Sequence, residues 1–324
     1  MSKAIRIHEP GGPEKMRWEE VEDRAPGLGE IAIRHTAVGL NFIDVYHRTG
    51  LYPVPLPTVL GLEGAGVVEA LGPEVTEFRV GQRVAYASPP IGAYAERRVI
   101  PAERVVAIPA EISDRQAAAM MLKGMTAQYL LRRTYRVSAG ETILVHAAAG
   151  GAGQIICQWA KHLGATVIGT VGSEDKARIA KAHGCAHTIN YNTEDFVARV
   201  KEITGGEGVP VVYDSVGDST FMKSLDCLRP LGMMVSFGQS SGKVGPFDAG
   251  ILSAKGSLFL TRPTLMTYTA KHADLVASAA ELFEVVAGGA VTVEIGQTYP
   301  LAEAAQAHRD LEARKTTGST VLIP

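Results

Sequence analysis

A segment of small residues between an apolar run and a helical pattern is the strongest chemical signal in the sequence. The apolar run covers residues 142–146, and Ala148, Gly150 and Gly153 fall at the three small positions of a G-x-G-x-x-G spacing, with alanine replacing the first glycine. Small side chains allow backbone N–H groups and the start of a helix to approach a pyrophosphate. The position between a strand and a helix favours dinucleotide binding over a turn that binds nothing.

The residues after the second apolar run bear on which dinucleotide is bound. An NAD-binding domain has an acidic residue at the end of this strand to hold the ribose 2′-OH. Here the run ends at Gly172, and Ser173 and Lys176 follow. Without a carboxylate to repel a 2′-phosphate, the pocket is predicted to prefer NADP(H), although Lys176 could also be a solvated helix lysine. Glu174 or Asp175 could turn inward and weaken this preference.

The elements that must position these residues alternate in kind from residue 141 onward. Apolar strand patterns cover residues 142–146, 166–170, 187–190, 209–213, 233–237 and 257–261. Amphipathic helix patterns cover residues 153–163, 174–183, 193–204 and 219–227. Strands and helices that alternate with short loops predict parallel strands joined by right-handed crossovers, in a doubly wound α/β sheet.

The N-terminal region has a different pattern, with short β-branched runs separated by Pro and Gly. Strand-like runs cover residues 31–38, 64–69, 83–87 and 104–108. These runs favour an antiparallel β barrel or open sandwich. Residues 52–57 are too rich in Pro for a helix or a central strand. Helical patterns at residues 114–122 and 126–133 follow, and we place a domain boundary near Lys123.

The C-terminal region is expected to return to the N-terminal domain. It contains a long helical pattern at residues 269–287, a short one around residues 303–314 and a strand-like run at residues 319–323. The length of 324 residues suits about two domains. We predict a substrate domain at residues 1–122, a cofactor domain at residues 123–262 and a returning C-terminal segment at residues 263–324.

Charge and cysteine content exclude several classes of function. The sequence has 32 Lys and Arg against 34 Asp and Glu, a formal net charge of −2, which leaves no basic excess to neutralise nucleic acid. Cys157, Cys185 and Cys227 are too dispersed for a disulfide framework or a four-thiolate zinc site. No leader-like segment or long apolar run is present, so we expect a cytoplasmic protein without a membrane partner.

The residues around the small-residue turn resemble a family signature. Between Gly140 and Lys161 the blocks Gly-Glu-x-x-Leu, Ala-Ala-Gly-Gly-x-Gly and Gln-x-x-Lys match the quinone oxidoreductase and ζ-crystallin signature of the zinc-free medium-chain dehydrogenases/reductases. The likeness extends over essentially the whole chain. It implies a GroES-like β domain, a Rossmann-like cofactor domain, a cleft between them, and a homodimer formed through a sheet edge at residues 256–260.

The resemblance also implies roles for individual residues. Asn41 and Thr126 are expected to face the nicotinamide, and Arg314 is expected either to reach the cofactor or to lie on the surface as a helix-end arginine. The residues implied to hold the phosphates and adenine are Gly150, Gly151, Gly153, Ser173, Lys176 and Tyr191. Those implied to line the nicotinamide ribose are Gly217, Phe237, Gly238, Ser240 and Phe259.

The sequence also bears on metal binding. Zinc-carrying members of this superfamily have a thiolate where this chain has Asn41 and an imidazole where it has Leu62. Asn41 and Leu62 do not offer the soft ligands that zinc prefers, and the nine histidines lack the spacing of zinc ligands. We therefore expect neither a catalytic nor a structural zinc ion.

A substrate reduced without zinc must accept hydride readily, as a quinone or an activated enone does. We predict an NADPH-dependent quinone reductase that acts in the expected cleft. A reductase of α,β-unsaturated aldehydes or ketones needs the same fold and cofactor and is the main alternative. A low-turnover NADPH-binding protein with a structural or RNA-binding role is a second alternative, because fold does not fix function.

The proton that completes the reduction could come from water or from a tyrosine. Tyr46 and Tyr52 could donate it or stack on a flat acceptor, and each could also be an ordinary packed aromatic residue. Asp44 could orient such a group or cap a loop. No obligate acid or base is assigned, and Asn41 is the third candidate for the catalytic site.

Overall fold

The computed structural model describes residues 1–324 and divides into two compact units. The first unit comprises Met1–Met125, Thr269–Ala287 and Val293–Pro324. The second comprises Thr126–Tyr268 and Gly288–Thr292. The functional domain ranges given above stay a prediction beside this structural division.

The first unit is built on two β-sheets. A seven-stranded sheet has the order β15-β16-β3-β5-β6-β8, with β7 paired to β3, and a three-stranded sheet has the order β2-β1-β4. The strands are β1 (Ser2–Ile7), β2 (Arg17–Val21), β3 (Glu30–Leu40), β4 (Thr58–Val59), β5 (Glu63–Leu71), β6 (Arg83–Ala87), β7 (Arg97–Pro101), β8 (Val106–Ala107), β15 (Ile295–Pro300) and β16 (Ser319–Ile323). Most pairs are antiparallel, as predicted for this region.

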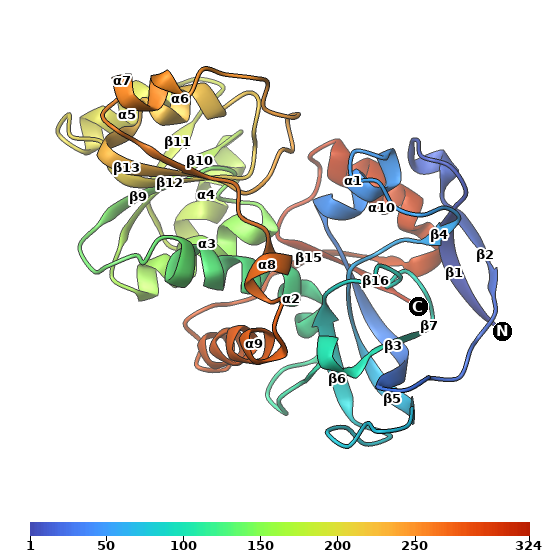
Figure 1. Cartoon of the computed structure of the whole chain (residues 1–324). Helices are drawn as coiled ribbons and strands as arrows, with labels where there is room; N and C mark the ends of the chain where they lie inside the picture. Colours follow the sequence, from blue (N-terminus) through green and yellow to red (C-terminus); the bar gives the residue numbers. More distant parts are fainter. The chain divides into compact units, whose positions relative to one another are not determined.

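The C-terminal strands complete a sheet that begins near the N-terminus. Strand β16 pairs with β3, so that Thr320 lies opposite Leu40 and Leu322 opposite Val38. In Figure 1 these strands, coloured red, lie beside the blue strands of the same unit. The sequence between β3 and β16 therefore includes the whole of the second unit.

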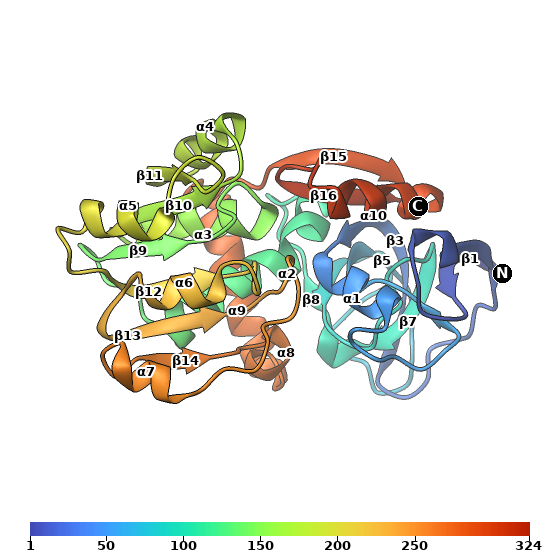
Figure 2. The same ribbon diagram turned by 90° about the horizontal axis from the view of Figure 1, so that it is seen from above.

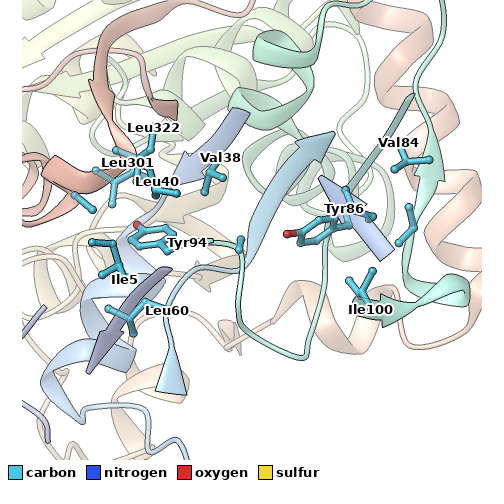
Figure 3. Packing of buried hydrophobic residues seen from close by; sticks show 14 of the residues in the cluster. Ile5, Val38, Leu40, Leu60, Val84, Tyr86, Tyr94, Ile100, Leu301 and Leu322 are labelled. Atoms are coloured by element: carbon cyan, nitrogen blue, oxygen red, sulfur yellow. The ribbon is translucent and has the colours of Figure 1, made fainter. Parts of the chain in front are cut away.

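The core of the first unit lies under the long strand β3. Alternate residues of this strand, such as Ile31 and Ile33, point inward and are almost completely buried. Figure 3 shows the Tyr94 ring among Leu40, Leu301 and other aliphatic side chains of this cluster. Such burial of apolar surface is the main stabilising contribution to the unit.

The helices of the first unit begin or end at recognisable signals. They are α1 (Phe42–Thr49), α9 (His272–Ala287), α10 (Ala304–Glu312) and most of α2 (Asp114–Tyr129), whose residues from Thr126 on belong to the second unit. Helix α1 follows Asn41 as its N-cap and ends at Gly50, whose φ of 78° is left-handed. Short 3-10 turns cover Pro13–Lys15, Ala102–Arg104 and Leu301–Glu303.

Helix α2 joins two predicted helical patterns. One helix runs from Asp114 through Gly124 to Tyr129 and continues as a π-helical turn at Leu130–Thr134, while the functional boundary near Lys123 stays a prediction. A Cβ atom at Gly124 would overlap the Leu282 side chain. The glycine therefore marks the close approach of α9, not a helix end.

The second unit is a six-stranded parallel sheet, and the predicted doubly wound fold is confirmed. Its order is β11-β10-β9-β12-β13-β14, which Figure 2 shows in spatial sequence. The strands are β9 (Thr142–Val145), β10 (Thr166–Val171), β11 (Cys185–Asn190), β12 (Val209–Asp214), β13 (Leu228–Ser236) and β14 (Phe259–Thr261). The chain reverses its direction of progress beside β9, where such sheets bind ligands at the carboxyl ends of their strands.

Six helices accompany this sheet. They are α3 (Gly151–His162), α4 (Glu174–Ala182), α5 (Phe196–Ile203), α6 (Phe221–Leu225), α7 (Gly250–Ala254) and α8 (Leu265–Tyr268). No helix of the structure is both long and apolar enough to cross a membrane.

Two strand predictions were inaccurate for local reasons. The strand expected at residues 257–261 begins only at Phe259, because Ser257 has a left-handed φ of 57°. The strand expected at residues 104–108 is reduced to Val106–Ala107, because Val105 closes a 3-10 turn by donating to the carbonyl of Ala102.

Candidate functional site

The turn after β9 has the geometry of a phosphate-binding loop. Ala147 has a left-handed φ of 53°, and its carbonyl accepts the N–H of Gly150 at 2.9 Å. A Cβ atom at Gly153 would overlap that carbonyl and would lie 2.8 Å from the Cα of Ala148. The absence of a side chain at Gly153 thus lets the turn lie directly on the helix. The surrounding structure holds Ala147 in its left-handed conformation despite the strain.

The start of helix α3 offers unpaired donors to an anion. Gly150 is the N-cap, and the first helical residues, Gly151 and Ala152, are partly exposed. The first N–H groups of a helix have no acceptor within it, and the dipole favours a negative charge there. Gln154 holds the turn in place by donating from Nε2 to the Ala149 carbonyl at 2.8 Å. The predicted glycines Gly150, Gly151 and Gly153 therefore fit a pyrophosphate.

A second group of predicted residues lies at the carboxyl ends of β10 and β11. Ser173 is the N-cap of α4, and its hydroxyl accepts the N–H of Lys176 at 3.3 Å. A Cβ atom at Gly172 would lie 2.5 Å from the Tyr191 hydroxyl, so these two residues are neighbours. Asn192 donates to the Gly172 carbonyl at 2.8 Å. The structure thus brings Ser173, Lys176 and Tyr191 to one corner of the sheet.

The two acidic residues of this corner have different surroundings. Asp175 is paired with Arg178 on the surface of its own helix. Glu174 accepts a hydrogen bond from Asn190 Nδ2 at 3.3 Å, which ties it to the end of β11. Glu174 therefore turns toward the strand ends and Asp175 turns away from them.

The loops after β12 and β13 form the other half of this edge. The buried carboxylate of Asp214 accepts the N–H groups of Val216 at 2.7 Å and Gly217 at 3.1 Å, and the Thr220 hydroxyl at 2.8 Å. Gly217 has a left-handed φ of 92°. Asp214 thus fixes the first of the two loops through its side chain.

The second loop is fastened to the first by backbone contacts. Phe237 donates to the Asp214 carbonyl at 2.8 Å, and Ser240 donates to the Ser215 carbonyl at 3.3 Å. A Cβ atom at Gly238 would overlap Ser215. The predicted residues that these two loops bring together are Gly217, Phe237, Gly238 and Ser240.

An arginine that the sequence reasoning missed supports the same loop. Arg262 donates from one guanidinium nitrogen to the carbonyls of Ser236 at 2.8 Å and Gly238 at 2.9 Å. Burial raises the pKa of the Tyr129 hydroxyl. A hydrogen bond with Thr126 and the charge of Arg262 partly oppose this rise. Thr126 therefore lies beside Tyr129, and its place at the nicotinamide stays a prediction. The only sequence signal for Arg262 was its position after an edge strand.

Two predicted cofactor residues are not in this group. Phe259 lies opposite Met233 in the middle of β13 instead of at its carboxyl end, and its side chain is 56% exposed. Phe259 therefore lies apart from the loops after β12 and β13, and its assignment to the nicotinamide ribose stays a prediction that this register does not support. Arg314 belongs to the first unit, where it follows α10 in an exposed position with a φ of 58°.

The first unit contains a buried polar cluster around Asn41. Asn41 donates from Nδ2 to Glu63 Oε2 at 2.7 Å, and Glu63 Oε1 accepts the N–H of Leu122 at 2.8 Å. Lys123 Nζ donates to the Leu40 carbonyl at 3.2 Å and lies 3.7 Å from Glu63 Oε2. Burial raises the pKa of Glu63, and the Lys123 charge and the Asn41 amide oppose this rise.

A chain of hydrogen bonds connects this cluster with α10. Asp44 accepts the backbone N–H of Asn41 at 2.9 Å and the Tyr94 hydroxyl at 3.0 Å, so its capping role is observed. Tyr94 also contacts His308 Nε2 at 3.1 Å, and Arg48 donates to His308 Nδ1 at 3.1 Å. Burial raises the pKa of Asp44 to about 7, against the lowering influence of Asn41 and Tyr94.

The two candidate tyrosines form a small aromatic group. The ring centroids of Tyr46 and Tyr52 are 5.2 Å apart in an edge arrangement, and Tyr52 donates its N–H to the Tyr46 carbonyl at 3.0 Å. Phe42 lies 6.3 Å from Tyr46 between ring centroids. Both tyrosines are partly buried, so each presents part of its ring to solvent.

The residues at the superfamily's zinc positions do not fit a zinc ion. Asn41 uses its amide nitrogen as a donor to Glu63, and Leu62 has no donor atom on its side chain. No group of three or more His, Cys, Asp or Glu side chains in the structure could hold a metal ion. The expected lack of zinc stays a prediction that this donor chemistry supports.

Two family models match the chain. One, described as zinc-binding dehydrogenase, matches residues 151–282, and the other, described as alcohol dehydrogenase GroES-like domain, matches residues 27–110. Together they cover parts of both units.

Individual relatives match over the full length. A quinone oxidoreductase from Pseudomonas aeruginosa is 54% identical, with 100% of each chain covered. A 2-haloacrylate reductase from a Burkholderia species is 49% identical, with 100% of this chain and 99% of that protein covered. The crystal structure of Escherichia coli quinone oxidoreductase complexed with NADPH matches with a TM-score of 0.98 at 49% identity, and covers 99% of this chain and 100% of that chain.

Proposed function

Because this chain belongs to the quinone oxidoreductases of the medium-chain dehydrogenase/reductase superfamily, we infer that it is an NADPH-dependent quinone oxidoreductase. The full-length identity of 54% to such an enzyme carries this conclusion. The geometry of the second unit agrees with it, since a glycine turn and an open helix start suit a dinucleotide. When bound, NADPH supplies the hydride for the reduction.

The residues of the second unit are proposed to bind and orient the cofactor. The N–H groups at the start of α3 hold the pyrophosphate, and Ser173 and Lys176 hold the 2′-phosphate beside Tyr191. The loops after β12 and β13 support the nicotinamide ribose through backbone groups near Gly217 and Gly238. An ordered backbone at these positions presents the reactive ring in one orientation, which is the protein's main contribution in cofactor enzymes.

The first unit is proposed to bind the acceptor. Tyr46 and Tyr52 present aromatic surface on which a quinone ring can stack, since offset and edge arrangements of flat rings are favourable. Asn41 is the N-cap of α1, the helix that contains Tyr46. Hydrogen bonds to Glu63 and Asp44 hold Asn41 in a single conformation. No tyrosine is assigned as an obligate proton donor.

A reductase of activated alkenes is the second candidate function. The 2-haloacrylate reductase that resembles this chain is 49% identical over its full length, close to the identity of the quinone-reducing relatives. A halogenated acrylate and a quinone both contain a carbon–carbon double bond conjugated with a C=O group. This conjugation makes both of them hydride acceptors. The fold and cofactor site would be the same for both acceptors.

The edge strand β14 supports a proposed homodimer. It is the last strand of the six-stranded sheet and leaves Phe259 exposed. An unpaired edge is a template for a strand of a second copy, which would extend the sheet.

A cytoplasmic location also remains a proposal, supported by Cys157, Cys185 and Cys227 as free buried thiols.

The decisive experiment follows NADPH oxidation by the purified protein at the nicotinamide absorbance. 1,4-Benzoquinone and an α,β-unsaturated ketone are offered separately, with NADH as the cofactor control. Faster turnover of quinone with NADPH is expected. Preference for the unsaturated ketone would move the activity to alkene reduction, and tight NADPH binding without turnover of either would contradict the assignment.

A further inference from the structure

Lys123 is a buried cation that the assignments above leave without a role. Its ammonium donates to the neutral Leu40 carbonyl at 3.2 Å and stands 3.7 Å from Glu63 Oε2. Glu63 makes its shorter contacts with other donors, the N–H of Leu122 at 2.8 Å and the Asn41 amide at 2.7 Å. Lys123 is therefore near a carboxylate without being tightly hydrogen-bonded to it.

The ammonium of Lys123 contacts residues next to Asn41 and Leu62 in the chain. Leu40 and Glu63, the two groups nearest the ammonium, are the chain neighbours of Asn41 and Leu62. Asn41 and Leu62 stand where the zinc-carrying members have their thiolate and imidazole. This chain thus places a positive charge next to the chain neighbours of Asn41 and Leu62.

Exposure distinguishes Lys123 from the rest of its cluster. The Lys123 side chain is 11% exposed, whereas the Glu63 side chain is 0% exposed. Asn41 is 4% exposed and has its amide nitrogen bonded to Glu63. Lys123 is consequently the most exposed side chain of the three, and its ammonium is held by the Leu40 carbonyl and the nearby Glu63 carboxylate.

We propose that the Lys123 ammonium binds the carbonyl oxygen of the acceptor and stabilises the negative charge that develops there. The proposal rests on the proposed function, because it assumes an acceptor that carries a carbonyl group. Hydride addition brings two electrons and one hydrogen to a quinone and leaves the hydroquinone monoanion. A Lys123 N–H donates to its charged oxygen, and water then supplies the second proton. A preorganised donor is worth more in such a buried place than in water.

The first test compares Lys123→Met with Lys123→Arg in the full-length protein. Loss of one such donor is expected to lower kcat for quinones by about 100-fold, with NADPH affinity unchanged, and Lys123→Arg should recover most of the rate. The loss should grow from strongly to weakly oxidising quinones, because a poorer acceptor needs more help with its charge. Lys123→Met leaves Glu63 buried and unbalanced, so Lys123→Met/Glu63→Gln serves as the second variant if the first fails to fold. A uniform loss across the quinone series, or a full rate in the double variant, would overturn the proposal.

The second test needs no turnover. 4-Nitrophenol resembles the hydroquinone monoanion when ionised, and its phenolate is recognised by its visible absorbance. The wild-type protein should increase the phenolate fraction below the free phenol's pKa, and Lys123→Met should not, while 4-nitroanisole, which cannot ionise, should bind both proteins equally. Equal phenolate fractions in wild type and variant would contradict the role of Lys123. Failure of quinone turnover in the wild type would instead overturn the proposed function, so the two results are distinguishable.

Discussion

The proposed binding surfaces of the two units consist of different groups, backbone in the second unit and side chains in the first. In the second unit the proposed cofactor contacts come from backbone groups and from positions such as Gly153 and Gly238, where a Cβ atom would overlap a neighbour. In the first unit the candidate acceptor surface is supported by buried charged side chains, Glu63, Asp44 and Lys123. The first kind of site is encoded in short stretches of sequence, whereas the second depends on contacts between distant residues. The two kinds should respond differently to mutation and to pH.

The largest expected effect concerns the pH dependence of the first unit. The pKa of Asp44 is raised by burial from its ordinary value to about 7, so the folded state binds this proton more tightly than the unfolded state. Its contribution to stability is complete below about pH 4 and is lost as the pH rises through about 7. At ~1.4 kcal/mol per pKa unit the loss is at most about 4 kcal/mol.

This loss is measurable in urea unfolding at pH 5 and pH 8, with Asp44→Asn as the matched variant. The protein has two tryptophans, Trp18 in β2 of the first unit and Trp159 in α3 of the second. A Trp159→Phe background makes the fluorescence report on the first unit alone. Wild type should lose more stability than Asp44→Asn between the two pH values. Parallel losses in both proteins would show that Asp44 is not the group responsible.

The next largest effect tests the backbone-built site. Gly153→Val forces a branched side chain against Ala147 and Ala148, and overpacking of this kind costs about 3 kcal/mol. If the cost falls on the loop, NADPH affinity should drop by roughly 100-fold. Fluorescence titration with NADPH measures it, with Ala152→Val at the partly exposed neighbouring position as control. Equal affinities of the two variants would contradict a role of Gly153 in shaping the proposed cofactor loop.

A smaller effect concerns the choice of cofactor. Lys176→Ala should raise the KM for NADPH by about tenfold, because a charged hydrogen bond to the 2′-phosphate is lost. The KM for NADH should change little, since NADH has no phosphate there. Lys181→Ala, on the last turn of the same helix, is the matched control. Equal changes for NADPH and NADH would remove Lys176 from the phosphate site.

The smallest effect is expected at Tyr52. Tyr52→Phe keeps the ring that packs against Tyr46 and removes only the hydroxyl. If the ring stacks on the acceptor and water supplies the proton, kcat and the KM for quinone should each change by less than about fivefold, since a neutral hydrogen bond contributes only about 1 kcal/mol or less. Steady-state kinetics against 1,4-benzoquinone decide this. A tenfold loss of kcat would identify Tyr52 as the proton donor.

The sequence predicted those parts of the molecule that depend on local pattern. The alternation of strands and helices after residue 141 and the small-residue turn at Gly150 both follow from neighbouring residues, and the structure contains both. The sequence showed two helical patterns, at residues 114–122 and 126–133, and the structure joins them through Gly124 into one helix. The contact of Gly124 with Leu282 explains why a glycine stands there. Tertiary packing overrode propensity there.

The remainder depends on contacts that no local pattern contains. Lys123 reaches the carbonyl of Leu40, and Tyr94 reaches His308, across long stretches of chain. The start of β14 was predicted two residues too early, because Ser257 interrupts the strand with a left-handed φ. Arg262 had no motif of its own, since its partners are backbone carbonyls.

The pairing of β16 with β3 has a consequence for the order of events during synthesis. Residues 126–268 of the second unit leave the ribosome as one nearly complete stretch, and only Gly288–Thr292 follow later. The first unit, in contrast, lacks the strand beside Leu40 and the His308 partner of Tyr94 until residues 293–324 have emerged. The residues of the first unit that are synthesised early therefore have an unpaired sheet edge while the second unit folds. This interval is the stage of synthesis at which the chain is most exposed to misassembly and most in need of chaperones.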